Sequence, residues 1–440
     1  MIKWILFIVA SILIINSLMA QQIWDLKGCI RHAIEGNLEL KNKTIEAVLK
    51  EQDLFMAKRE WLPSVGAYTN LYSNFGHSQD VFGRIQRNDN LNSNMGITAD
   101  IMLYTFGLLK HQIQKSKFEI DAVILEKKLL ERVLTIKVIQ GFLDMMLKEA
   151  LMEASDSTVF YSRLLYERTM KTTDVGTTSE LELHEAKATL ARDNQQLAQA
   201  KIDWGRARLN LAQLMLLDDE NQLSIIKETE ETFNEQLILN EKLLAEAYAK
   251  HPGLLRFDTL RHGLEIERRL IQAQRYPVIK GSASIGSTYF NPLKMQNTAG
   301  FFQQAKDNFA QQIAITVSIP IYDKGRNRLE LKKIDLSKKK LDLEAMQGKL
   351  DIRQQIEKIY YDYRNNQKTC EFAKESLMYA EQAMSFAKKS YEAGRSTIYD
   401  LNTSRNSFVQ AKSQWLQAKY SALFSYKMLL FELASDTKLE

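Results

Sequence analysis

An internal repeat covers nearly all of the 440-residue chain and limits the folds that it can adopt. The offset from Pro63 in WLP to Pro277 in RYP is four positions shorter than the offset from Gly107 in LYTFG to Gly325 in IYDKG. The second copy therefore holds a four-residue insertion between these two points, and we call the longer offset the repeat offset. Such a duplication is considered before any other fold, because each copy then predicts the structure of the other.

The distribution of prolines predicts very long helices. Proline is excluded from helix interiors, and the five prolines leave residues 64–251 and all residues after 320 free of it. Residues 108–171 contain a single glycine, Gly141. As one helix, this segment would extend roughly 96 Å. A helix of that length is too long to pack against a single globular core, so the pattern favours a coiled coil.

The segments that return along these helices carry a coiled-coil seam with alternating spacings of 3 and 4 residues. Large residues mostly occupy one seam position and small residues the other, which lets two helices approach closely. We interpret the seam as packing without chemistry. Its members are Leu183, Ala186, Leu190, Asp193, Leu197, Ala200, Trp204, Ala207 and Leu211, and, one repeat offset later, Leu401, Ser404, Phe408, Ala411, Trp415, Ala418, Ala422, Ser425 and Leu429.

Each copy also has one isolated glycine just before its seam. Gly176 and Gly394 are separated by the repeat offset and interrupt otherwise helical sequence. Glycine tolerates the backbone angles that a helix end requires. The two glycines therefore predict the far ends of two long helical hairpins, where the chain reverses.

Period-two alternation of apolar and polar residues predicts strands in each copy. Ten or so alternating residues suit a tilted bilayer crossing, although an antiparallel sheet in a soluble α+β domain would show the same pattern. The strands are expected at 95–104 and 309–321, with weaker partners at 64–75 and 278–290 and polar loops at 76–92 and 291–307. Each copy thus offers one β-hairpin.

The N-terminus and the composition indicate export. Residues 1–20 contain Lys3 followed by an apolar run, which predicts a signal peptide cleaved between Ala20 and Gln21. No later apolar stretch approaches the 20 or so residues of a transmembrane helix, so membrane entry would require β-strands. The net charge of +5 comes without a long basic block, which argues against nucleic acid. Two cysteines, Cys29 and Cys370, do not make a disulfide framework. They could form a single long-range bridge, but the sequence favours two buried free thiols.

The sequence lacks the common signatures of an enzyme. It contains no glycine-rich phosphate loop, and the His184-Glu185 pair has Ala188 where a metalloprotease helix would need a second histidine. The six histidines are scattered, and the cysteines lack metal-site spacing. We therefore predict no catalysis, no cofactor and no resident metal.

Four membrane-length strands per chain would leave unpaired edges in lipid, so closure requires further copies. Two chains would give a barrel filled by side chains, and three would give twelve strands and a lumen. The segment IWDLKGCIRHAIEGNLELK, the proline-marked hairpins, the paired long helices and the two glycine turns together resemble the TolC outer-membrane efflux family over residues 22–432. The order and duplication of these parts carry the resemblance.

The resemblance implies a mainly α fold with a membrane β-barrel portion. It implies a homotrimer with one twelve-strand barrel in the outer membrane and a helical tunnel in the periplasm. The partners would be outer-membrane lipid, a periplasmic adaptor and an inner-membrane pump. The expected organisation is a signal peptide at 1–20, a first repeat at 21–217 with a β-hairpin at about 64–106, an acidic connector at 218–239, a second repeat at 240–432 with a β-hairpin at about 278–321, and a tail at 433–440.

The resemblance also implies roles for residues at the two turns. Asp400 matches an acid that narrows the periplasmic mouth, and Tyr391 matches a gating tyrosine whose acidic partner would be Glu182. The family's second ring acid corresponds to Thr403, and its gate arginine corresponds to Ser396 with Arg395 adjacent, so the gate contacts differ from the family pattern. The adaptor-docking positions correspond to Val175, Gly176, Thr177, Ala393 and Gly394. A simpler interpretation of Asp400 and Glu182 is that they are solvated acids in the first turns of helices, which the helix dipole favours.

Three functions follow from these observations. The first is an exit channel for small toxic compounds that a pump and an adaptor hand over. The second is a conduit for type I protein secretion or metal-ion efflux. The third, of a different class, is a periplasmic coiled-coil adaptor or scaffold that never enters the membrane. An adaptor would usually have one helical hairpin, whereas this chain has two equivalent ones.

Overall fold

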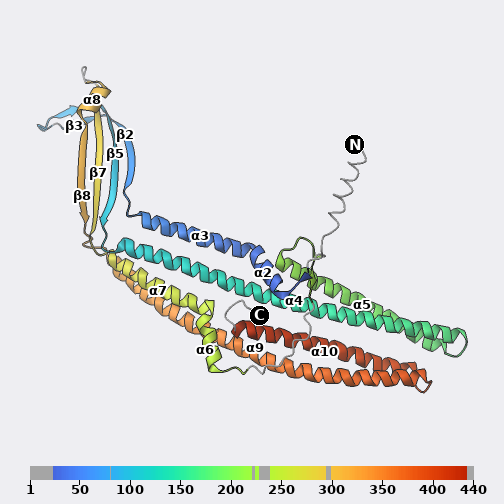
Figure 1. Ribbon diagram of the computed structural model, residues 1–440. Coiled ribbons are helices and arrows are strands. Elements are labelled where there is room, and N and C mark those ends of the chain that lie inside the picture. The colour runs from blue at the N-terminus through green and yellow to red at the C-terminus, as the bar shows by residue number, and fades with distance from the viewer. Residues whose placement is uncertain (1–22, 80, 221–222, 227–237, 294–298, 434–440) are drawn as a thin grey trace, which may run out of the picture. The chain divides into compact units, whose positions relative to one another are not determined.

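A computed structural model describes residues 23–79, 81–220, 223–226, 238–293 and 299–433 (Figure 1). The expected signal peptide, most of the acidic connector and the tail after Leu433 lie outside these residues. The chain divides into two compact units. We call residues 45–124 and 256–345 the strand unit, and the remaining residues the hairpin unit.

One antiparallel four-stranded sheet forms the centre of the strand unit. Its order is β2 (Ser64–Asn74), β5 (Asn90–Tyr104), β7 (Val278–Pro292) and β8 (Ala310–Ser318). The expected β-hairpin of each repeat is present, as β2 with β5 and as β7 with β8. Pairing of β5 with β7 joins the two repeats into a single sheet (Figure 1). Gly96 lies opposite Gly286 with no room for a Cβ at either position, which keeps the central strands close. The prediction of one hairpin per copy is confirmed.

The strand ends differ from the expectation. The last strand stops at Ser318, before the expected end at Ile321, because Pro320 has no N–H with which to continue the ladder. The first loop is expected at 76–92, but β5 begins at Asn90 and the loop itself contains a small hairpin, β3 (His77–Gln79) with β4 (Ile85–Arg87). The second loop contains a short helix, α8 (Phe301–Asp307). These elements lack the apolar alternation from which strands are predicted.

The helices of the two repeats have matching lengths. The helices α4 and α9 contain 67 residues each, and α5 and α10 contain 36 residues each. In the first repeat the helices are α2 (Leu26–Gly36), α3 (Leu38–Arg59), α4 (Leu108–Asp174) and α5 (Glu180–Met215). In the second repeat they are α6 (Glu241–Lys250), α7 (Pro252–Ala273), α9 (Arg326–Glu392) and α10 (Ile398–Leu433). No helix in these described ranges is both long and apolar enough to cross a membrane.

The hairpin unit is held together by the predicted seam and by a core near its connector. The seam residues Ala186, Leu211, Leu401 and Ala422 are buried. The short helix α2 packs against α5, and its counterpart α6 packs against α10. A short parallel pair, β1 (Ile23–Trp24) with β6 (Ser224–Ile225), joins the N-terminal segment to the connector. The core residues are Cys29 and Ala33 of α2, Val138, Ile139 and Phe142 of α4, and Leu211 and Met215 of α5.

Both cysteines are free thiols. Cys29 is fully buried in this core, and burial raises the pKa of its thiol to about 12. Cys370 is half-buried, and its thiol pKa is also raised, chiefly by desolvation. The favoured prediction of buried free thiols therefore holds for Cys29, whereas Cys370 is free but only half-buried.

Candidate functional site at the hairpin tips

The two hairpins end in the same backbone turn. Gly176 has φ of 75° and Gly394 has φ of 68°, the left-handed conformation in which side chains are strained. At the first turn, the N–H of Thr177 donates to the carbonyl of Thr172 at 2.9 Å, and the N–H of Gly176 donates to that of Thr173. Two equivalent hydrogen bonds close the second turn, from Arg395 to Ser390 and from Gly394 to Tyr391. This pair of bonds is a Schellman motif, which satisfies the last carbonyls of a helix.

The returning helices also begin in the same way. The side chain of Ser179 caps α5 by accepting from the N–H of Glu182 at 3.3 Å. Thr397, the counterpart of Ser179 in the second repeat, accepts from the N–H of Asp400 at 3.2 Å. The Asp400 carboxylate in turn accepts from the Thr397 N–H at 3.0 Å and from its hydroxyl at 2.7 Å. The second start is therefore a complete capping box.

The capping box determines the electrostatics of Asp400. The hydroxyl and the N–H of Thr397 hold the pKa of the Asp400 carboxyl below its ordinary value. The carboxylate is therefore a fixed negative charge at an exposed tip. The simpler interpretation, a helix-start acid, describes its local contacts. A pore role is compatible with it, because the capping box leaves the carboxylate exposed.

The other predicted tip residues lie at or near the surface. Val175, Thr177, Ala393 and Arg395 are exposed, as adaptor contacts would have to be. Thr403 is exposed and donates its hydroxyl hydrogen to the carbonyl of Tyr399. The Oγ of Ser396 is buried and lacks a hydrogen-bond partner within the described part of the chain.

The expected gating contact between Tyr391 and Glu182 stays a prediction. Both side chains are half-buried, and no hydrogen bond joins them in the described structure. An exposed ion pair joins the two hairpins nearby instead, with 3.6 Å between Nη1 of Arg168 and Oε1 of Glu392. Exposed pairs of this kind contribute little to stability.

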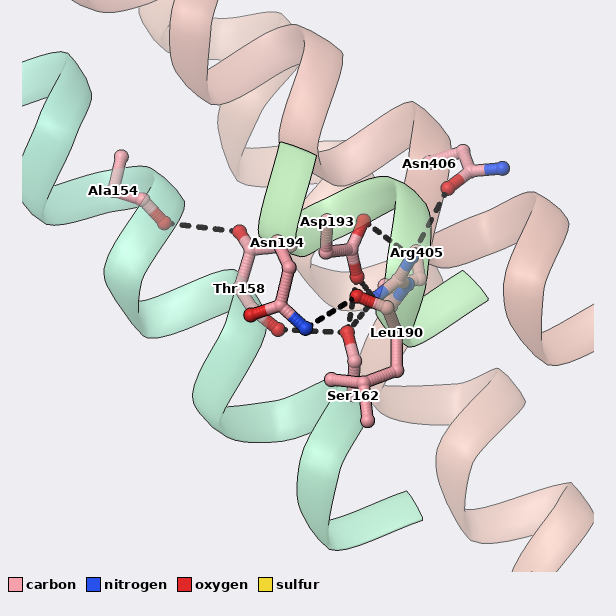
Figure 2. A network of polar contacts seen from close by, with 8 residues as sticks. All are labelled: Ala154, Thr158, Ser162, Leu190, Asp193, Asn194, Arg405 and Asn406. Carbon is pink, nitrogen blue, oxygen red and sulfur yellow. Dashed lines mark hydrogen bonds and ion pairs between the residues drawn. The ribbon is translucent and has the colours of Figure 1, made fainter. Parts of the chain in front are cut away.

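A buried polar network lies behind the tips, and the sequence analysis missed it (Figure 2). Arg405 of α10 reaches Asp193 of α5, with 2.6 Å from Nη1 to Oδ2 and 3.3 Å from Nη2 to Oδ1. Nη1 also lies 2.6 Å from the hydroxyl of Ser162 of α4, which hydrogen-bonds to Asp193 as well. The exposed fractions of Ser162, Asp193 and Arg405 are only 2%, 4% and 5%. We call these three residues the latch cluster.

The seam spacing alone predicts packing without chemistry for Asp193, and the side chain is indeed buried, but it packs as one half of an ion pair. A charge at a seam position was the available signal, since buried charges require a partner. The repeat does not reveal the partner, because none of the three residues is kept in the other copy. The equivalent positions there are Ala411 for Asp193, Lys187 for Arg405 and Ala380 for Ser162. The latch cluster is therefore a feature in which the two copies differ.

A second buried ion pair joins the hairpins at the other end of α10. Arg132 of α4 contacts Glu432, whose second oxygen accepts from Gln355 at 3.0 Å. The Arg132 guanidinium lies 4.5 Å from the centre of the Phe431 ring. The polarity is reversed relative to the latch cluster, because here α10 supplies the acid. The helix α10 is thus tied to the first hairpin by an arginine near its start and a glutamate at its end.

A family model for outer membrane efflux proteins matches residues 29–215 and 243–431, which together make up most of the chain and coincide with its two repeats. The chain belongs to the outer membrane efflux protein family. Outer membrane efflux proteins of this kind are channels with a large helical periplasmic part, so the chain is an outer-membrane transport protein. The resemblance drawn from the duplicated hairpins is confirmed.

Solved structures share the fold of this outer membrane efflux protein at low sequence identity. The CmeC outer membrane channel of Campylobacter jejuni has a TM-score of 0.75 at 14% identity, with 93% of this chain and 85% of that chain covered. The outer membrane protein VceC of Vibrio cholerae has a TM-score of 0.73 at 15% identity, with 93% and 95% covered. The MtrE outer membrane channel of Neisseria gonorrhoeae has a TM-score of 0.71 at 16% identity, with 93% and 88% covered. No curated protein sequence matches the chain.

Proposed function

We propose that three copies of this outer membrane efflux protein close into one channel-tunnel. The supporting observation is the four-stranded sheet with open edges at β2 and β8, followed by paired helices of 67 residues. Open edges are unstable in lipid because their backbone groups lack partners. Edge-to-edge pairing of β8 with β2 of the next copy would remove every edge, and twelve strands would leave a water-filled lumen. The helical hairpins would then continue as a periplasmic tunnel.

The cargo is proposed to be small toxic compounds, handed over by an inner-membrane pump through a periplasmic adaptor. The exposed tips around Gly176 and Gly394 offer the adaptor two similar docking turns per chain. The passage needs no catalysis by the channel. Among the described residues, no three or more His, Cys, Asp or Glu side chains gather in a way that could hold a metal ion.

The tips are also proposed to gate the tunnel. Threefold symmetry would bring three Asp400 carboxylates near one axis, where they attract cations and repel one another. Tyr391, Glu182, Thr403, Ser396 and Arg395 surround this ring in the proposed gate. Because the latch cluster ties α10 to the first hairpin directly behind the tips, its ion pair would resist separation of the hairpins.

The native mass of the protein, extracted from outer membranes in mild detergent, tests the assembly. A mass of three chains is expected, and a mass of one or two chains contradicts the proposal. Cargo is tested in cells that lack the gene and in cells that express it. Lower accumulation of a fluorescent toxic compound on expression supports small-molecule efflux. Unchanged accumulation, together with loss of a secreted protein from the medium without the gene, would identify a protein conduit instead.

A further inference from the structure

The strand unit carries a distinctive set of side chains at the edge of the sheet where its strands meet the helices. Four segments lie at this edge, because β2 and β7 begin there and β5 and β8 end there (Figure 1). We call them together the collar. The collar comprises residues 58–63, 104–111, 273–277 and 319–328.

Every strand end in the collar has an aromatic residue at it or a few positions away along the chain. Trp61 precedes β2, Tyr104 ends β5, Tyr276 precedes β7 and Tyr322 follows β8, and all four are exposed. Phe106 adds a fifth ring, 4.6 Å from Tyr104 and 5.5 Å from Tyr276 between ring centres. Rings of Trp and Tyr at strand ends are typical of the boundary between hydrocarbon and headgroups. The aromatic residues of the collar therefore suit a position at the level of lipid headgroups.

The collar also accounts for the whole net charge of the chain. It contains seven basic and two acidic residues, an excess that equals the +5 of all 440 residues. All seven basic side chains are exposed. One of the two acids, Asp323, is engaged in a turn, where it accepts from the N–H groups of Gly325 and Asn327. The basic residues are Lys58, Arg59, Lys110, Arg275, Lys324, Arg326 and Arg328.

The backbone forms a tight turn at each of the two strand-to-helix junctions in the collar. Phe106 and Gly107 have φ of 49° and 89°, and the equivalent Lys324 and Gly325 have φ of 57° and 76°. Buried Asn327 ties the second turn to α7, with 2.5 Å from its Nδ2 to the carbonyl oxygen of Ile271. The strand-to-helix turn is thus the same in both repeats, and the collar is a built surface and not a loose tail.

We propose that the collar binds anionic phospholipid headgroups in the periplasm-facing leaflet of the outer membrane. The helices that follow the strands belong to the periplasmic part, which places this edge of the sheet at that leaflet. Basic side chains attract anionic lipid over about a Debye length, while the neighbouring rings bury their apolar faces beside the acyl chains. The inference rests on the proposed membrane barrel, but it depends on neither the proposed gate nor the cargo.

Competition between two lipids tests this inference on the purified full-length protein. Native mass spectrometry counts the lipids retained from detergent micelles that contain equal amounts of phosphatidylglycerol and phosphatidylcholine with the same acyl chains. The test variant is Lys58→Gln/Lys110→Gln/Arg328→Gln. The matched control, Lys187→Gln/Lys374→Gln/Lys388→Gln, removes the same charge from exposed positions in the hairpin unit.

The wild type is expected to retain phosphatidylglycerol in preference to phosphatidylcholine. The collar variant should lose at least about fivefold of that preference at low salt, whereas the control variant should keep it. Raising the salt concentration should weaken the preference of the wild type, because the attraction is screened. Equal retention of both lipids by the wild type would overturn the inference. So would an equal loss in the control variant, which would point to net charge alone.

Discussion

Arg405 of the second hairpin and Asp193 of the first form a two-pronged ion pair that water does not reach, with Nη1–Oδ2 at 2.6 Å and Nη2–Oδ1 at 3.3 Å. Such a pair is a weak contributor to net stability, because removing two charges from water is expensive. Breaking it is costly, since the remaining charge stays buried without a partner. The pair is therefore suited to hold one arrangement of the hairpins against alternatives.

Removal of either partner should destabilise the hairpin unit. Asp193→Leu alone or Arg405→Met alone is expected to reduce the free energy of unfolding by about 3–5 kcal/mol. The double variant Asp193→Leu/Arg405→Met removes both charges and should recover most of that loss. Denaturant unfolding of the four proteins measures the coupling. Purely additive losses would show that the pair acts as two independent side chains.

The Asp400 ring can be separated from its local capping role by comparing the two repeats. Asp400→Ala with Tyr391→Phe should loosen the mouth, raising single-channel conductance and lowering cation preference. Glu180→Ala, in the first turn of α5, removes an exposed first-turn acid that lies outside the proposed gate. Unchanged conductance and cation preference in the Asp400→Ala/Tyr391→Phe variant, or an equal change in the Glu180→Ala control, would contradict the ring.

Acid should weaken the cap of α10. The pKa of Asp400 is lowered in the folded chain by Thr397, so its contribution is present above the unfolded pKa. That contribution is lost as the pH falls through the lowered value. NMR titration of the Asp400 carboxyl should show a lower pKa in the wild type than in Thr397→Ala. Identical titration midpoints in the two proteins would show that the Thr397 hydroxyl does not lower the pKa of Asp400.

His251 should make stability depend on pH in a different window. Burial, and secondarily Arg132, lower the pKa of His251 from 6.5 to about 4, and its Nδ1 accepts from the N–H of Gly253 at 3.1 Å. Between these two pH values the unfolded chain binds more protons, so stability should decrease as the pH falls from 6.5 toward 4. The midpoint of thermal unfolding should fall less steeply in His251→Gln. The exposed His262 provides the control, and His262→Gln should keep the wild-type slope.

The turn glycines should tolerate substitution worse than a helical glycine. Gly176→Ala and Gly394→Ala place a Cβ on left-handed backbone and should each cost about 1–2 kcal/mol. Gly205 lies within α5 with open space around it, so Gly205→Ala should stabilise the helix by up to about 1 kcal/mol. The midpoint of thermal unfolding should fall in the two turn variants and rise in Gly205→Ala. A gain at either turn would mean that the left-handed conformation is not maintained.

The repeat allowed much of the fold to be predicted, because the same feature could be found twice. Gly176 with Gly394 located both turns, and the alternating segments located both hairpins. The latch cluster could not be predicted in this way. Arg405 meets Asp193 only because two hairpins lie side by side, and no local spacing records which faces meet. Asp193 itself satisfied the seam spacing, so periodicity concealed the partner that its charge required.

The equal lengths of the duplicated helices impose a rule on how the chain can change in evolution. The four-residue difference between the copies is absorbed before Gly325, whereas α4 and α9 keep 67 residues each and α5 and α10 keep 36 each. Loss of one heptad from both arms of a single hairpin would shorten it by about 10 Å. The tip of the shortened hairpin would then lie short of the tip of the other hairpin. A change in hairpin length therefore has to be made in α4, α5, α9 and α10 together. The side chains of the two copies are therefore free to diverge, whereas the lengths of their helices have to change together.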